Sequence, residues 1–218
     1  MRDAVARSVF EALFAFDQKA AEVSGACLAG IDEAGRGPLA GPVVAAAAIL
    51  RRGVTLQGLN DSKKVPPPLR EKLYWLIVKH AFVGIGIVHE NMIDSINIFQ
   101  ATRLAMKMAV LALPKTPEHL LIDGNMKLDL PLKQKAIVKG DQKSAAIAAA
   151  SIVAKVYRDA WMRHLDTLYP AYFFARHKGY ATAVHLEAMR EYGLSPVHRR
   201  SYEPVRRISE EQFEKELS

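Results

Sequence analysis

Residues 27–38 of the chain read CLAGIDEAGRGP, and this short stretch decides the fold. Residues 27–31 are an apolar segment that predicts a strand, and the glycines and proline after it predict a turn. Between them stand two adjacent carboxylates, Asp32 and Glu33. An ionised carboxylate is costly to bury without a partner, so acids carried by an apolar strand to the mouth of a loop indicate a binding site. A solvated turn is the alternative, and it is preferable for the pair taken alone.

Outward from this stretch, the spacing of apolar residues predicts alternating strands and helices. Further strands are expected at residues 43–50, 81–89, 118–122 and 136–138, and helices at residues 3–22, 69–80, 95–113, 144–168 and 181–192. The charged tail from residue 195 is expected to end in a short helix. Three early strands followed by helix, strand, strand and helices predict an α/β fold with a mixed sheet flanked by helices.

Composition narrows the class of protein. The 218 residues are 50% hydrophobic and 24% charged, which predicts one globular domain with a full core. The formal net charge of +7 favours nucleic acid as a partner, with an anionic membrane second. Cys27 is the single cysteine, which excludes an internal disulfide and a cysteine-rich zinc cluster. The apolar stretches are too short to span a membrane and no signal peptide is evident, so we expect a soluble cytoplasmic protein.

Two further acids favour a metal site. Asp123 ends a second apolar strand, and if that strand neighbours the first, Asp32 and Asp123 project into one crevice at the sheet edge that binds ligands in open α/β folds. Asp159, in the long helix, is a third candidate, although pairing with Lys155 one turn earlier is a fair alternative.

Carboxylates without a histidine or cysteine cluster favour hard cations, Mg²⁺ or Mn²⁺, over zinc. Two such ions about 4 Å apart can activate water and stabilise the leaving oxygen in phosphodiester hydrolysis. The spacing of Gly35, Gly37 and Gly41 superficially matches a dinucleotide-binding loop. That loop requires a following helix, which Pro38 and Pro42 argue against. The residues therefore favour a metal-dependent nuclease.

A set of motifs in a fixed order resembles ribonuclease HII, the type 2 ribonuclease H family, in its bacterial form. The resemblance covers roughly residues 27–206. The motifs are residues 30–38 (GIDEAGRGP), 61–64 (DSKK), 122–125 (IDGN), 138–141 (VKGD), 149–159 (AASIVAKVYRD), 177–180 (HKGY) and 198–202 (HRRSY). Arg36 and the single helix before Cys27 favour this family over its sister, ribonuclease HIII.

The resemblance implies an RNase H-like fold: a five-stranded mixed sheet with flanking helices and a helical C-terminal part. It divides the chain into an N-terminal helical extension (1–26), a catalytic core (27–168) and a C-terminal helical region (169–218) that completes the substrate-binding surface. It implies an endoribonuclease that cuts the RNA strand of RNA–DNA hybrids and nicks 5′ to ribonucleotides embedded in DNA, leaving 3′-hydroxyl and 5′-phosphate ends. Such enzymes act in DNA replication and in ribonucleotide removal. The implied catalytic, metal-binding acids, with Mg²⁺ or Mn²⁺, are Asp32, Glu33, Asp123 and Asp159.

The resemblance also assigns substrate contacts. The loop of Gly35, Arg36 and Gly37 is expected to read the 2′-hydroxyl at an RNA–DNA junction, and Tyr180 to pack on the neighbouring deoxyribose. Glycines let backbone groups approach the sugar closely, and the 2′-hydroxyl distinguishes RNA from DNA.

Basic and polar residues are expected to face backbone phosphates, with a solvated surface as the alternative for each. They are Ser62, Lys63 and Lys64, and a later cluster of Arg176, Lys178, Arg199, Arg200, Arg206 and Arg207. The expected partners are RNA–DNA hybrids and DNA containing ribonucleotides, with no membrane. The resemblance suggests a monomer, and the tail lacks the paired aromatics of a peptide that binds a sliding clamp.

Overall fold

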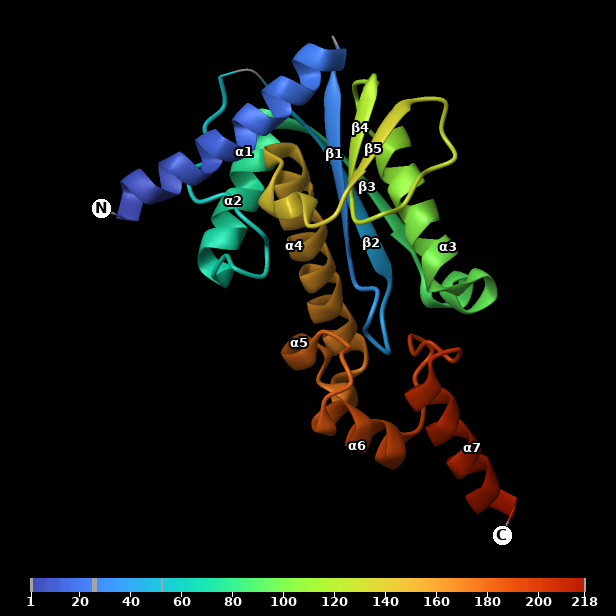
Figure 1. Cartoon of the computed structure of the whole chain (residues 1–218). Coiled ribbons are helices and arrows are strands. Elements are labelled where there is room, and N and C mark those ends of the chain that lie inside the picture. The colour runs from blue at the N-terminus through green and yellow to red at the C-terminus, as the bar shows by residue number, and fades with distance from the viewer. Residues whose placement is uncertain (1, 25–26, 52, 218) are drawn as a thin grey trace.

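The computed structural model describes residues 2–24, 27–51 and 53–217 (Figure 1). Five strands form one mixed sheet in the order β3-β2-β1-β4-β5, which confirms the predicted fold class. The strand β1 runs antiparallel to β2 and parallel to β4; β2 and β3 are antiparallel, and β4 and β5 are parallel. The strands are β1 (Leu28–Ala34), β2 (Val43–Leu50), β3 (Ala81–Val88), β4 (His119–Asp123) and β5 (Lys133–Ile137).

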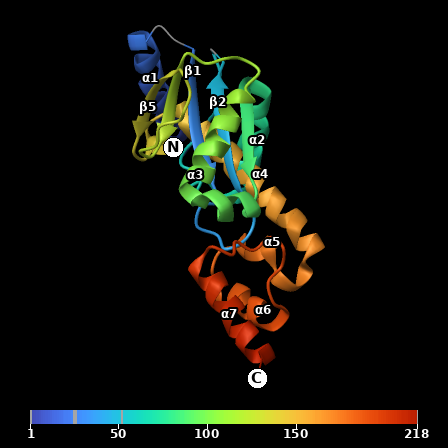
Figure 2. The same cartoon turned by 90° about the vertical axis from the view of Figure 1, so that its right-hand side faces the viewer.

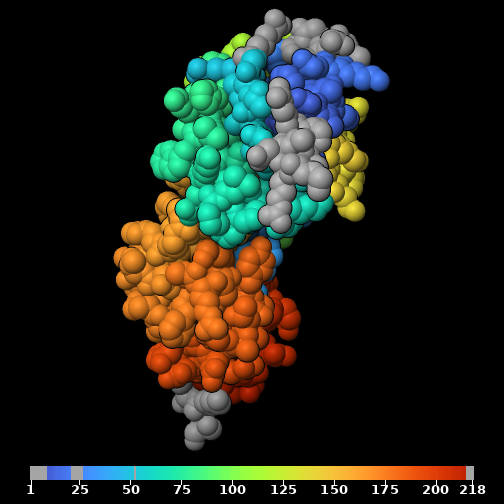
Figure 3. All heavy atoms as spheres, turned by 90° about the vertical axis from the view of Figure 1, so that its left-hand side faces the viewer, coloured from blue at the N-terminus to red at the C-terminus, as the bar shows by residue number. Residues whose placement is uncertain are grey.

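Helices cover both faces of the sheet (Figure 2). One face packs on α3, and the other packs on α4 together with α1 and α2. Three further helices follow α4 and lie beyond the end of the sheet, where Figure 3 shows them in orange and red below the blue-to-green body. The helices are α1 (Arg2–Ser24), α2 (Pro67–His80), α3 (Glu90–Leu111), α4 (Ala145–Leu168), α5 (Phe174–His177), α6 (Ala183–Tyr192) and α7 (Glu203–Leu217), with short 3₁₀ turns at Gly140–Gln142 and Pro170–Tyr172.

The helix α4 lies very close to β1. A Cβ atom added to Gly30 would come within 2.1 Å of the backbone carbon of Ala146, so no larger residue fits there without moving the helix. The alanines of β2 and of the first turns of α4 are fully buried and allow the same close approach. The first turns of α4 are therefore fixed against the strand that carries Asp32.

Two elements depart from the predicted bounds for identifiable reasons. The strand β1 does not stop at residue 31 but continues through the acids, because β2 pairs with this segment as far as Ala34. The helix α3 begins at Glu90, earlier than expected, and is kinked at Asn97. The Asn97 side chain accepts hydrogen bonds from the N–H groups of Phe99 and Gln100, so it caps a second helical segment.

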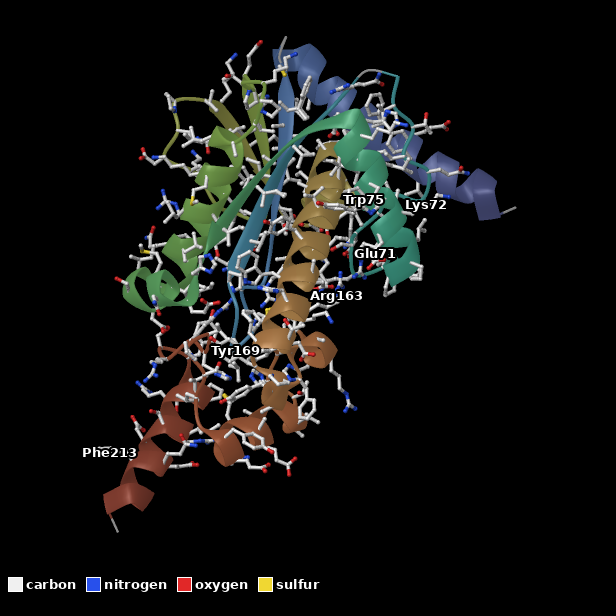
Figure 4. The ribbon with its side chains drawn as sticks, turned by 180° about the vertical axis from the view of Figure 1, so that it is seen from behind. Glu71, Lys72, Trp75, Arg163, Tyr169 and Phe213 are labelled. Atoms are coloured by element: carbon white, nitrogen blue, oxygen red, sulfur yellow. The ribbon has the colours of Figure 1, made fainter. Side chains whose placement is uncertain are left out.

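The packing between α2 and α4 leaves polar contacts at its rim. Glu71 of α2 points toward Arg163 of α4, 3.9 Å away, while Trp75 projects outward with 68% of its surface exposed (Figure 4). The inner side of α2 is apolar, with Leu73 and Ile77 fully buried. Because both partners of the Glu71–Arg163 pair are half exposed, the apolar side holds α2 in place more than the ion pair does.

The N-terminal helix is tied to the core by one buried carboxylate. Asp17 of α1 accepts a hydrogen bond from the N–H group of Ala146 at 2.7 Å, in the first turn of α4. The first N–H groups of a helix have no hydrogen-bond partner within the helix, and a carboxylate can accept from them. Its negative charge also interacts favourably with the positive end of the helix dipole. Burial raises the pKa of Asp17 to about 6, against the opposing effect of its hydrogen bonds. Phe10 and Leu13 of α1 are buried in the same layer.

Replacing Asp17 with alanine should lower the free energy of unfolding by about 1–2 kcal/mol, because α4 loses a capping acceptor. Asp17→Asn, which keeps an acceptor oxygen, should lose less. Urea unfolding of the purified variants measures the change. Gln18→Ala, at an exposed position on the same helix, is the control. If Asp17→Ala and Gln18→Ala lowered the free energy of unfolding equally, the capping role would be contradicted.

Candidate active site

Two acids meet where β1 and β4 lie side by side. Ile31 pairs with Ile122, so the residues that follow them, Asp32 and Asp123, lie at the same level of the sheet. Side chains alternate along a strand, and Ile31 belongs to the α3-side core, so Asp32 projects toward α4. There it is 6% exposed and lies beside Ser151 of α4.

A third acid is brought in by the turn before α4. The carboxylate of Asp123 accepts a hydrogen bond of 2.6 Å from the N–H group of Gly140. Gly140 in turn accepts hydrogen bonds from the N–H groups of Lys143 and Ser144, which close the short 3₁₀ turn. Asp141 sits in this turn. These hydrogen bonds of Gly140 therefore hold the turn, and with it Asp141, beside Asp123.

These acids line one cleft of about 500 Å³ between the strand ends, the β1–β2 loop and the segment before α6. Most of the predicted site residues meet in this cleft: Asp32, Glu33, Gly35, Arg36, Gly37, Ser62, Lys63, Asp123 and Tyr180. Five residues outside the predicted set of site residues also line it, namely Ala34, Asp141, Ser151, Lys155 and Arg158. Lys64 and Asp159 do not line it.

The carboxylates perturb one another. Burial raises the pKa of Asp32 well above its usual value, and the charges of Glu33 and Asp123 raise it further. Burial also raises the pKa of Glu33, opposed mainly by Arg36, whose guanidinium lies 3.3 Å away. The pKa of Asp141 is raised to about 6 by burial, by Asp61 and by Asp123. Burial is therefore the main cause of the raised pKa values, and repulsion among the acids adds to it.

This cluster of buried carboxylates, with oxygen as its only donor atom, fits a hard divalent cation. In the described residues, no three of these side chains converge tightly enough to form a ready-made metal cage. Mg²⁺ normally keeps several waters and does not require a closed protein cage. The residues positioned to hold such a cation are Asp32, Glu33, Asp123 and Asp141.

The structure does not bring Asp159 into the cleft, and it shows the alternative pairing instead. The ammonium of Lys155 lies 2.6 Å from one carboxylate oxygen of Asp159, and Arg70 of α2 lies 3.8 Å from the other. The cleft-facing side of α4 carries Ser151, Lys155 and Arg158. Asp159 lies one turn after Lys155 on α4, between the Lys155 ammonium and Arg70 of α2.

The sequence does contain a signal for Asp141. The VKGD motif ends in this acid, and it follows β5, the parallel neighbour of β4. The left-handed conformation of Lys139 (φ 55°) then starts the turn that carries it. Strand order was needed to place that turn beside Asp123.

The loop after β1 is shaped by two buried arginines. Arg199 donates to the carbonyl oxygens of Gly35, Arg36 and Gly41 at 2.6–3.0 Å. Arg158 donates to the carbonyls of Pro42 and Ala40, and also of Lys178, at 2.9–3.1 Å. Gly35 itself has a φ of 96°, which favours glycine.

The prediction that Arg199 faces phosphate is wrong, because this side chain is fully buried. Burial lowers the pKa of both guanidinium groups, that of Arg158 to about 10. Within the described residues neither forms an ion pair. Backbone carbonyls supply most of the hydrogen-bond acceptors for both charges, and Arg199 also donates to the Tyr202 hydroxyl. Their donors fix the Gly35–Pro42 loop from behind while Gly35, Arg36 and Gly37 line the cleft.

Tyr180 stands across the cleft from this loop. Its ring is 47% exposed and lies beside Gly37, where an added Cβ would come within 3.8 Å of the ring. Lys178 and Gly179, just before it, both have positive φ, and the Gly179 carbonyl accepts from the Leu39 N–H at 2.7 Å. Loop and tyrosine are therefore joined through the backbone.

A family model for ribonuclease HII matches residues 29–205 of the chain. The chain belongs to the ribonuclease HII family. It is 57% identical to a ribonuclease HII of Geobacillus kaustophilus over 83% of this chain and 70% of that protein. The crystal structure of ribonuclease H2 from Pyrococcus horikoshii superposes with a TM-score of 0.72 at 28% identity, over 86% of this chain and 99% of that one. Bst-RNase HIII, solved in complex with Mn²⁺, shares the fold with a TM-score of 0.62 at 20% identity, over 83% of this chain and 68% of that one.

The resemblance drawn from the motifs is thus confirmed. The chain is a bacterial ribonuclease H, a hydrolase that acts on RNA–DNA hybrids. No helix in the described ranges is long and apolar enough to cross a membrane.

Replacing Arg199 with methionine should lower the free energy of unfolding by about 3 kcal/mol or more, because several buried carbonyls lose their donor. Arg200→Met is the matched control, since its side chain is exposed. Thermal and urea unfolding measure both. A loss no greater than that of the control would show that the loop does not depend on Arg199.

Proposed function

We propose that the enzyme nicks duplex DNA on the 5′ side of an embedded ribonucleotide, in addition to cutting the RNA strand of hybrids. The observation that carries this proposal is the pairing of Tyr180 with the Gly35–Arg36–Gly37 loop across the carboxylate cleft. A ribonucleotide is distinguished from its neighbours by its 2′-hydroxyl, and a loop with glycines lets the backbone approach the sugar. Tyr180 offers an exposed ring to the adjoining deoxyribose.

We propose Mg²⁺ or Mn²⁺ as the cofactor, held by Asp32, Glu33, Asp123 and Asp141; Asp141 takes the place that the sequence gave to Asp159. The Mn²⁺ in the related Bst-RNase HIII structure supports this choice. When bound, such cations supply Lewis acidity and an activated water for phosphodiester hydrolysis. Hydrolysis adds water across the P–O3′ bond and leaves a 3′-hydroxyl and a 5′-phosphate.

The basic residues of the cleft would hold the phosphates of the cut strand. Lys63 and Lys155 line it, and the salt bridge to Asp159 holds the Lys155 ammonium in place. Ser62 is buried and accepts a hydrogen bond from the Ser151 hydroxyl, so its main contribution here is to the wall of the cleft. Lys64 is exposed outside the cleft, where it could meet phosphates farther along the duplex. Such contacts position the duplex without reading its sequence.

The C-terminal helical region, residues 169–218, completes the substrate surface in this proposal because it supplies Tyr180. We expect the enzyme to act as a cytoplasmic monomer. We do not assign clamp binding to α7, because Gln212 donates a hydrogen bond to the Met189 carbonyl at 2.9 Å and so helps hold α7 against α6.

A labelled DNA duplex with one ribonucleotide tests the proposed activity directly. With Mg²⁺ or Mn²⁺ we expect a single nick 5′ to the ribonucleotide, and no cut in the all-DNA duplex. A parallel RNA–DNA hybrid checks that the preparation is active. Cleavage of the hybrid without a nick at the single ribonucleotide would refute the proposal.

The assignment of the fourth acid predicts different effects at two positions. Asp141→Asn should lower kcat by at least about 100-fold, as removal of a group acting in the transition state does. Asp159→Asn should lower it far less, since that side chain lies outside the cleft and pairs with Lys155. Asp129→Asn, at a carboxylate that is 89% exposed, is the control. Steady-state cleavage of the hybrid measures all three, and a larger loss at position 159 than at 141 would reverse the assignment.

A further inference from the structure

Three buried histidines lie behind the cleft and take no part in the proposed chemistry. His185 and His198 are almost fully buried, and His177 is 8% exposed. The rings of His177 and His185 stack with centroids 4.4 Å apart, and Phe174 packs edge-on against His185. Burial and neighbouring rings or charges lower the pKa of all three, so they are neutral at physiological pH.

Hydrogen bonds fix the tautomer of two of these rings. The N–H group of Ser195 donates to Nδ1 of His198 at 2.9 Å, so the proton of His198 is on Nε2. That Nε2 lies 3.0 Å from Nε2 of His185, which must accept. The proton of His185 is then on Nδ1, which donates to the carbonyl oxygen of Tyr180 at 2.9 Å. This chain of hydrogen bonds runs from the Ser195 N–H through His198 and His185 and ends at the backbone carbonyl of Tyr180.

His177 holds the same segment from the other side. Its Nδ1 accepts from the Gly179 N–H at 3.1 Å, so its Nε2 carries the proton and donates to the Tyr172 carbonyl at 2.8 Å. Its own carbonyl accepts from the Tyr180 N–H at 3.0 Å. Both peptide groups that flank Tyr180 are thus tied to the histidine cluster.

The segment needs such ties because its backbone is strained. Lys178 has a φ of 54°, a left-handed conformation that costs a non-glycine residue about 1 kcal/mol and persists only where its surroundings impose it. The turn that results carries the Tyr180 ring toward Gly37. A relaxed turn would move the ring out of place without unfolding the domain.

We propose that His198, acting through His185, is a positioning residue for Tyr180 and so sets the preference of the enzyme for single embedded ribonucleotides over continuous hybrids. This inference rests on the proposed packing of Tyr180 on a deoxyribose. A single ribonucleotide in DNA has a deoxyribose next to it, whereas a hybrid has another ribose there. Misplacing Tyr180 therefore weakens the first substrate more than the second.

Asparagine and glutamine substitutions separate this role from general packing. The side-chain amide of asparagine can occupy the position of histidine Nδ1, and the longer side chain of glutamine carries its amide to the position of Nε2. His198→Gln keeps a donor toward His185, whereas His198→Asn keeps only the Ser195 contact. At the other ring each amide breaks one contact: His185→Asn keeps a donor toward Tyr180 but loses the acceptor for His198, and His185→Gln does the reverse. All four variants place a polar amide in the same buried cluster, so they are matched in burial.

The readout is kcat/KM for a single-ribonucleotide duplex divided by kcat/KM for a continuous hybrid. We expect His198→Asn, His185→Asn and His185→Gln each to lower this ratio by about tenfold, the scale of a small misplacement in a site. His198→Gln should stay near wild type, as should the exposed control His164→Leu. In a Tyr180→Ala background, none of these changes should alter the ratio further, because they act through that ring.

The outcomes are distinguishable. Failure of the wild type to nick at a ribonucleotide, or an unchanged ratio for Tyr180→Ala, would overturn the proposed function and this inference together. A lowered ratio for Tyr180→Ala with equal effects of asparagine and glutamine at position 198 would overturn only the inference. Thermal unfolding checks that each variant folds, and if His198→Asn does not, an unchanged ratio for the His185 variants would overturn the inference.

Discussion

The site depends on two positive charges that are buried without a carboxylate partner. The guanidinium groups of Arg158 and Arg199 are almost inaccessible to water, and a buried charge is tolerated only when its hydrogen bonds are satisfied. The carbonyls of the Gly35–Pro42 loop satisfy most of these donors. One arginine belongs to α4 and the other follows α6, so this requirement joins the catalytic sheet, the long helix and the C-terminal region into one unit.

The cleft gathers four carboxylates on neighbouring elements. Asp32 and Asp123 reach it from paired strands, and Asp141 reaches it from a turn fastened to Asp123 through Gly140. The pKa values of Asp32 and Asp141 are raised mainly by burial and further by neighbouring acids, which reflects the cost of burying these charges together. A divalent cation removes that cost, and the same cation is the natural partner of a phosphodiester. Substrate choice is separate, since it is assigned to the loop and to Tyr180.

Sequence reasoning was most accurate where strand pairing fixed the outcome. The positions of Asp32 and Asp123 follow from two apolar strands lying side by side, so both could be placed in one crevice beforehand. Asp159 could not be placed, because the direction of a side chain on α4 depends on which side of the helix meets the sheet. Arg199 was taken for a surface residue, since an arginine next to exposed Arg200 gives no sign of burial. Asp141 required knowledge that its turn lies beside Asp123, which is a tertiary contact.

The central claim is that Asp141 completes a cation site with Asp32, Glu33 and Asp123. A crystal soaked in MnCl₂ and measured at the manganese absorption edge tests it most directly. We predict an anomalous difference peak among these carboxylates, about 2.2 Å from the nearest oxygens, a usual bond length for a hard divalent cation. A peak coordinated by Asp159 instead, or no peak in the cleft, would contradict the account.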